Sequence, residues 1–157
     1  MRDTHNKTGN GSVTGEGAVG HSDHEWFRVA TLLPEREWSD VRASLASVEW
    51  GDQQPYPVTI VDSVVAHGAD QVLALTTSMN DLIVAPSPVA GPPIDVVAVR
   101  APGSWRRHAP GTILIEYLST MGRNTEIERP ENEALPLFWR FMETEFGIHT
   151  LGLDQRS

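Results

Sequence analysis

Three arginines and a tryptophan are concentrated in residues 100–108, a short stretch of an otherwise acidic chain. The whole sequence has 12 Lys and Arg residues against 21 Asp and Glu residues. A guanidinium pairs bidentately with a carboxylate or phosphate, and Trp and Arg are enriched at the centres of protein interfaces. The stretch therefore predicts a loop that binds an anion or a partner protein through Arg100, Trp105, Arg106 and Arg107. A second interpretation stays open, in which these arginines pair within the chain with Glu126, Glu128 or Glu131.

Two carboxylates share predicted strand faces with apolar side chains. Asp62 and Glu116 each alternate in phase with aliphatic residues of a predicted strand. Burial disfavours the charged form of a carboxylate, which is how proteins prepare a general acid or base near neutral pH. His67 and His108 lie at strand ends or in loops, where catalytic groups often sit. We expect the candidate acid–base residues, if the protein is an enzyme, to be Asp62, His67, His108 and Glu116. The alternative is that the two carboxylates lie on an exposed face or pair with arginine.

Other motifs in the chain predict neither a cofactor nor a metal. Residues 15–20 read G-x-G-x-x-G, but a glycine-rich polar segment precedes them where a dinucleotide-binding loop needs a strand. His21, Asp23 and His24 are metal-ligand types in a segment expected to be too flexible to hold a metal. The absence of cysteine excludes disulfides, thiolate zinc sites and iron–sulfur clusters.

The net charge of −9 argues against general binding to nucleic acid or anionic membranes, because both need a cationic surface. No apolar stretch approaches the roughly 20 residues that span a bilayer, and no secretory signal is visible. We therefore expect a soluble cytoplasmic protein.

Two amphipathic helices are predicted, one in each half of the chain. Trp38, Val41, Leu45 and Val48 form an apolar stripe within residues 34–49, which Gly51 ends. Residues 135–146 form the second helix, with Gly147 after its last turn and a short turn over 130–134 before it. Residues 1–24 are rich in glycine and poor in large apolar side chains, which predicts a flexible tail before one domain over 25–157.

The remaining apolar segments are short, rich in β-branched residues and separated by turns, which is typical of strands. Only short links join most of them, so an antiparallel sheet is favoured over a parallel one. The sequence thus predicts an α+β fold with a single antiparallel sheet of about five to seven strands and the two helices packed on it. The predicted strands are Trp26–Leu33, Val58–Ala66, Gln71–Thr77, Leu82–Ala85, Ile94–Arg100, Thr112–Leu118 and Thr125–Glu128.

Three functions remain open at the level of sequence. The favoured one is a small acidic protein-binding module, such as an inhibitor, an immunity-type protein or an adaptor, which uses the arginine–tryptophan loop to contact another protein. The second is a small-ligand pocket protein or cofactor-free enzyme with Asp62, His67, Glu116 and Arg100 in a pocket between sheet and helix. The third is a structural subunit that forms oligomers through the last helix or an edge strand.

Overall fold

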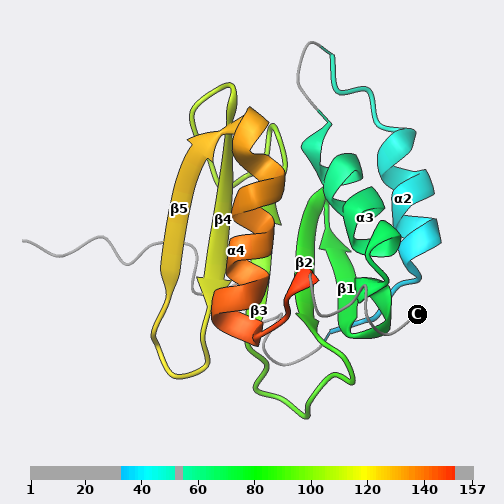
Figure 1. Ribbon diagram of the computed structural model, residues 1–157. Coiled ribbons are helices and arrows are strands. Elements are labelled where there is room, and N and C mark those ends of the chain that lie inside the picture. Colours follow the sequence, from blue (N-terminus) through cyan, green and yellow to red (C-terminus); the bar gives the residue numbers. More distant parts are fainter. Residues whose placement is uncertain (1–32, 52–54, 151–157) are drawn as a thin grey trace, which may run out of the picture.

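Five antiparallel strands form one sheet in the computed structural model, which describes residues 33–51 and 55–150 (Figure 1). Each strand pairs with the next along the chain, so the order across the sheet is β1-β2-β3-β4-β5. The strands are β1 (Leu73–Ser78), β2 (Asp81–Pro86), β3 (Val96–Arg100), β4 (Thr112–Leu118) and β5 (Thr125–Pro130). This arrangement confirms the predicted α+β fold with a single antiparallel sheet. The predicted tail, the strand predicted from Trp26, the glycine motif and the N-terminal histidines lie outside the described residues, Leu33 apart.

Residues 58–66 are helical, so the strand predicted there is wrong. α3 runs from Tyr56 to Ala66, with Pro57 in its first turn, where the missing N–H of proline costs no hydrogen bond. Ile60, Val61 and Val64 are fully buried at helical spacing. The alternation that predicted a strand uses Ile60 and Val64, which also fit one face of a helix, and packing overrides the strand preference of β-branched residues.

α2 (Trp38–Ala46) lies within the predicted helix over 34–49 but begins later. The chain before it is extended, and the Arg36 N–H donates to the Leu75 carbonyl of β1 at 2.8 Å. The indole Nε1 of Trp38 then donates to the Leu73 carbonyl at 3.2 Å. These bonds fix the entry to α2 against the outer edge of β1.

α4 (Ala134–Phe146) agrees with the predicted last helix. A 3₁₀ turn, η2 (Glu131–Glu133), precedes it, as the two prolines in this region indicated. Pro136 therefore falls in the first turn, where a proline is tolerated. Gly147 ends the helix in the left-handed region, with φ at 66°, and its N–H donates to the Glu143 carbonyl at 3.0 Å.

The two faces of the sheet are buried by different parts of the chain. α3 and α4 cover one face (Figure 1), where Ile60, Phe138 and Met142 pack on strand residues such as Ile115. We call this the helix face. On the opposite face, which we call the loop face, a smaller apolar cluster joins alternate strand residues to Leu33 and to the β2–β3 connection. Successive side chains of a strand point to opposite faces, so this division assigns every strand residue to one side. No helix within the described residues is long and apolar enough to cross a membrane.

A matched pair of substitutions tests the packing of α3. Val61→Ala is expected to lower the free energy of unfolding by about 2–3 kcal/mol, because it removes two methyl groups from a fully buried side chain and leaves a cavity. Val65→Ala removes the same atoms one turn later, where the residue is 47% exposed, and is expected to change it by less than about 0.5 kcal/mol. Urea denaturation of both variants measures the difference. Equal losses would contradict the assignment of the buried helix surface.

Candidate functional site

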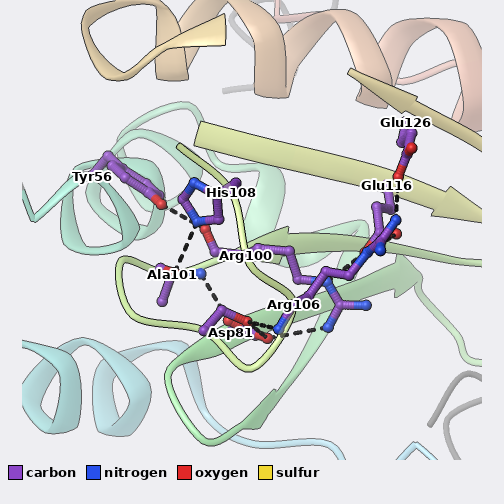
Figure 2. Close-up of polar contacts among 9 residues, drawn as sticks. Tyr56, Asp81, Arg100, Ala101, Arg106, His108, Glu116 and Glu126 are labelled. Carbon is purple, nitrogen blue, oxygen red and sulfur yellow. Dashed lines mark hydrogen bonds and ion pairs between the residues drawn. The ribbon is translucent and has the colours of Figure 1, made fainter. Parts of the chain in front are cut away.

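A network of charged side chains lies on the loop face, beneath the connection between β3 and β4. Arg100 ends β3, and Glu116 lies on the adjacent strand β4, where its register partner is Ala98. Both side chains point to the loop face, because Val99 and Ile115 beside them belong to the helix-face core. Residues 101–111, which we call the β3–β4 loop, fold back over these side chains (Figure 2).

Arg100 is the centre of the network. Arg100 is only 3% exposed, and its guanidinium contacts two buried carboxylates. Its Nε lies 2.5 Å from Glu116 Oε2, and its Nη1 lies 3.1 Å from Asp81 Oδ2. The ring of Trp105 covers the guanidinium at 5.4 Å from its centroid, within the range of a cation–π contact. The hydroxyl of Tyr56, on α3, donates to the backbone carbonyl of Arg100 at 2.6 Å. Figure 2 shows Asp81, Glu116 and Tyr56 close to Arg100, with the four side chains coming from β2, β4, α3 and β3.

Asp81 ties the start of the β3–β4 loop to the sheet. It is 1% exposed, and besides Arg100 it accepts hydrogen bonds from the Ala101 N–H at 2.7 Å and the Ser104 hydroxyl at 2.8 Å. A buried carboxylate is tolerated only when its oxygens are paired, and here a cation, an amide and a hydroxyl pair them. Asp81 therefore holds the last residue of β3 and two residues of the loop that follows it in one geometry.

Arg106 ties the middle of the loop to β4 and β5. Its Nε lies 3.2 Å from Glu116 Oε1, and its Nη2 lies 2.6 Å from Glu126 Oε2. Partial burial works to lower the pKa of Arg106, but the hydrogen bond and charge of Glu126 and the charge of Glu116 outweigh it and raise the pKa. Arg100 and Arg106 thus form ion pairs with three carboxylates of the same chain, those of Asp81, Glu116 and Glu126.

The end of the loop is held by His108 and Glu128. The two ring nitrogens of His108 lie 3.1 Å from the Ala101 carbonyl and 3.1 Å from the Thr112 hydroxyl. Glu128 accepts hydrogen bonds from the Ala109 N–H at 2.9 Å and from the Thr112 hydroxyl at 2.8 Å. These two bonds lower the pKa of Glu128, with a smaller contribution from the nearby His108. Both ends and the middle of the loop are therefore fixed to the sheet.

The four residues predicted for partner or anion binding differ in their availability. Arg100 is buried between Asp81 and Glu116, and Arg106 is bonded to Glu116 and Glu126. Both arginines therefore pair within the chain, and Glu126 is the one of the three expected glutamates that takes part. The ring of Trp105 lies over Arg100, yet the residue is 39% exposed. Arg107 is exposed and forms no ion pair with residues 33–51 or 55–150. Trp105 and Arg107 are the two of the four that face outward.

The predicted acid–base residues lie on opposite sides of the sheet. Asp62 is on α3, half exposed, and pairs with Arg42 of α2 at 2.9 Å. His67 follows α3, where Nδ1 lies 2.8 Å from the Ser63 carbonyl and the ring meets Trp139 edge-on. α3 covers the helix face, whereas Glu116 and His108 belong to the loop face with Arg100. The structure therefore does not bring the predicted set together in one pocket between sheet and helix.

The loop-face network has no arrangement for nucleophilic catalysis. The hydroxyl of Ser104 donates to Asp81, whose other contacts neutralise it, and the nitrogens of His108 contact Ala101 and Thr112 instead of Ser104. A serine nucleophile needs a base within hydrogen-bond reach that a third group orients. Among the described residues, no group of three His, Asp or Glu side chains is placed to hold a metal ion. The chemistry that the network supports is the positioning of its loop.

Two hollows lined by described residues lie on the helix side of the molecule, and Tyr56 alone connects one of them to this network. One has a volume of about 530 Å³ and lies between the starts of α3 and α4, with Tyr56, Thr59, Glu131 and Leu135 in its lining. The other, about 540 Å³, lies between α2 and α3 and contains the Arg42–Asp62 pair. Burial, with smaller contributions from Asp81 and Glu131, raises the pKa of Tyr56, so its hydroxyl stays protonated as a donor to Arg100.

Comparison with known proteins finds no match to this chain among protein-family models, curated proteins or solved structures.

Asp81 is the site residue that the sequence interpretation missed. An Asn-Asp pair between two apolar segments is typical of a turn, so the sequence indicates no role for Asp81 beyond the turn between β1 and β2. Its Cα register partner is Ser78, which places it at the first position of β2, and the strand pairing then brings it beside the end of β3. A lone aspartate at the start of an apolar strand was the available signal, and it does not specify a partner 19 positions away.

Removal of the central guanidinium tests the network. Arg100→Met leaves the Asp81 and Glu116 carboxylates buried without a cation, and is expected to lower the free energy of unfolding by about 3–5 kcal/mol. Arg42→Met is the matched control, because the Arg42–Asp62 pair is 51% exposed on each side and exposed pairs contribute less than about 1 kcal/mol. Urea denaturation at constant ionic strength compares them. A loss for Arg100→Met no larger than that for Arg42→Met would contradict the network.

The lowered pKa of Glu128 gives a pH dependence with a defined sign. A carboxylate whose pKa is lower in the folded than in the unfolded chain stabilises the fold above the unfolded value of about 4.3. That contribution is lost as the pH falls through the lowered value. The unfolding free energy of Glu128→Gln should therefore lie below that of the wild type at pH 7, and the difference should vanish on acidification. Glu49→Gln, at an exposed position, serves as the control. A difference for Glu128→Gln that does not shrink at low pH would refute the loop anchor.

Proposed function

We propose that this protein is a protein-binding module whose contact surface includes the outward side of the β3–β4 loop, with Trp105 and Arg107 as its central contacts. The observation that carries the proposal is the combination of a fixed loop with an exposed tryptophan. The carboxylates of Asp81, Glu116, Glu126 and Glu128 bond to residues of the loop and hold it against the sheet. Trp105 is nevertheless 39% exposed above it.

Rigidity of the loop is what makes it suitable for binding. A partner that binds a flexible loop must order it, and each immobilised side chain costs about 0.5–1.5 kcal/mol. Here hydrogen bonds at Ala101, Ser104, Arg106 and Ala109 have already ordered the backbone and side chains. Contacts made by Trp105, whose ring lies over Arg100, would therefore contribute to affinity with little of that cost, and in this pair only the Arg107 side chain would still have to be immobilised.

The charge distribution narrows the chemistry of the partner. The guanidinium groups of Arg100 and Arg106 are neutralised within the chain, so Arg107 is the cation of this loop that remains for an external carboxylate. The chain as a whole carries −9, and complementary charge speeds the encounter of two proteins. We therefore propose a partner with a basic surface, which places an apolar side chain on Trp105 and an acidic group near Arg107. The proposal includes a cytoplasmic location, where a chain without cysteine needs no disulfides.

The binding module is preferred to a cofactor-free enzyme because the predicted acid–base residues are divided between the two faces of the sheet. Asp62 and His67 lie on the helix side, and Glu116 is already occupied by two arginines on the loop side. A structural oligomer is the remaining alternative, and the size of the pure protein in solution distinguishes it from a module that binds a different protein.

A double substitution tests the proposed contact surface. Trp105→Ala/Arg107→Ala is expected to weaken binding at least about tenfold, because truncation of central Trp and Arg contacts typically costs more than 1 kcal/mol each. A partner is first identified by co-purification from cells of the source organism. Its affinity for each variant is then measured with purified proteins by titration calorimetry.

The matched control for this test is Met121→Ala/Arg123→Ala in the β4–β5 loop at the other end of the sheet. It removes one exposed apolar side chain and one cation, as the test variant does, with Met121 77% exposed. This control should change the affinity by less than about twofold. Equal weakening by both variants, or by neither, would contradict the assignment of the surface. Thermal unfolding of each variant is compared beforehand.

A further inference from the structure

The two edges of the sheet differ in what covers them. At β1, the Arg36 N–H donates to the Leu75 carbonyl, the Arg36 guanidinium to the Thr77 hydroxyl at 2.7 Å, and the Trp38 indole to the Leu73 carbonyl. At the other edge, β5 pairs with β4 over its whole length, from Thr112↔Pro130 to Tyr117↔Thr125. No strand or loop of residues 33–51 and 55–150 pairs with the outer side of β5, which lies at the margin of the sheet in Figure 1.

The register of β4 and β5 identifies the backbone groups at this outer edge. The Glu131 N–H donates to the Gly111 carbonyl at 2.9 Å, so residues 111 and 131 form a hydrogen-bonded pair. Such pairs alternate with non-bonded pairs along an antiparallel ladder. Thr125, Ile127 and Arg129 therefore direct their N–H and C=O groups to β4. Glu126 and Glu128 direct theirs outward, and Pro130, next in this alternation, has no N–H to offer.

The side chains along the same edge set the charge of a strand that could pair there. Glu126 and Glu128 are exposed on the loop face, with Glu126 55% exposed, and each keeps an unshared part of its carboxylate surface beside its bond to the loop. Ile127 lies between them on the helix face and is half-buried. An incoming strand is therefore favoured when it carries cations at two alternate positions and an aliphatic residue between them, because opposite charges and aliphatic pairs stabilise cross-strand neighbours.

A second copy of this chain does not fit that description. If two β5 strands pair antiparallel with their helices on the same side, the registers with the greatest overlap place Glu126 opposite Glu128 of the other copy, Glu126 opposite its own copy, or Glu128 opposite its own copy. Like charges directly opposite one another destabilise a strand pair. The acidic edge thus disfavours self-association, as charged edge strands commonly do, but it does not disfavour a basic strand.

We propose that the outer edge of β5 binds an extended basic segment of a partner protein, with Lys or Arg at alternate positions, by addition of a sixth strand to the sheet. Main-chain hydrogen bonds to Glu126 and Glu128 align the segment, and their carboxylates select its charge. The inference does not rest on the contact surface proposed at Trp105 and Arg107, since it uses a different element and different groups.

Amide hydrogen exchange of the intact protein tests the pairing directly. The probe is a synthetic peptide of alternating lysine and valine, and the control peptide alternates glutamate and valine. On saturation with the lysine peptide, exchange at the Glu126 and Glu128 N–H groups should slow by at least about tenfold, because these amides gain partners. Exchange at Ile127 should change far less, since its N–H already bonds to β4.

Two variants at one position separate the backbone contribution from the charge. Glu126→Ala removes the carboxylate and keeps the outward N–H, whereas Glu126→Pro removes both and leaves the bonds to β4 untouched. The lysine peptide should bind Glu126→Pro at least about tenfold more weakly than Glu126→Ala. Should the proline variant fail to fold, the exchange measurement on the wild type decides alone.

Three outcomes would overturn the inference. The first is equal binding of the lysine and glutamate peptides, and the second is binding of the lysine peptide without protection of the Glu126 and Glu128 amides. Protection of these amides that rises with protein concentration in the absence of peptide would assign the edge to a second copy instead. Loss of binding in Trp105→Ala/Arg107→Ala leaves this edge unaffected, so the failure of one surface is distinguishable from the failure of the other.

Discussion

The burial of Arg100 between Asp81 and Glu116 is the constraint on which the loop face depends. A guanidinium that is 3% exposed is tolerated only with carboxylates in contact, and the two carboxylates are tolerated only with the guanidinium. The three residues come from β2, β3 and β4, so satisfying them requires the register that these strands adopt. Because Asp81 also binds the Ala101 amide and the Ser104 hydroxyl, the same requirement fixes the chain that leaves β3. A well-packed apolar replacement can match such a network in stability, but it would not specify the position of the loop.

Much of the fold could be predicted, because most of the sequence patterns fit only one type of secondary structure. The stripe within residues 135–146 and the glycine after it predicted α4, and the alternating segments from β1 to β5 predicted the sheet with errors of a few residues at the strand ends. The strand prediction for residues 58–66 is wrong because Ile60 and Val64 fit both the two-residue period of a strand and the spacing of a helix. Two neighbouring residues distinguish the helix from a strand. Val61 is fully buried, whereas Asp62 is exposed and pairs with Arg42. Their environments depend on α2 and the sheet, which the local sequence does not contain.

The sequence indicates several residues of the candidate site, but not which of them contact one another. Trp105, Arg106 and Arg107 lie in the β3–β4 loop, and their binding role stays a prediction. The alternation of Glu116 with aliphatic residues left its burial open, and the structure has it buried and paired with arginine. Which arginine is buried is decided by strand register: Arg100 is in phase with Glu116 across β3 and β4, whereas Arg107 lies beyond the strand in the loop. The number of positions between Arg100 and its partners, 16 and 19, carries no signal in a single sequence. The same holds for the separation of Asp62 and His67 from Glu116 by the sheet.

In the proposed function, the charged network supports the binding surface. This requires that the Arg100 guanidinium is buried and bonded in solution, and the exchange of its Nε–H with solvent, followed by NMR of the ¹⁵N-labelled protein, tests this most directly. Bonded to buried Glu116, this proton should exchange at least about a hundredfold more slowly than the Nε–H of Arg42 in its exposed pair. Equal exchange rates for the two arginines would mean that the network is open to water, and the loop would then lack the support that the proposed function requires.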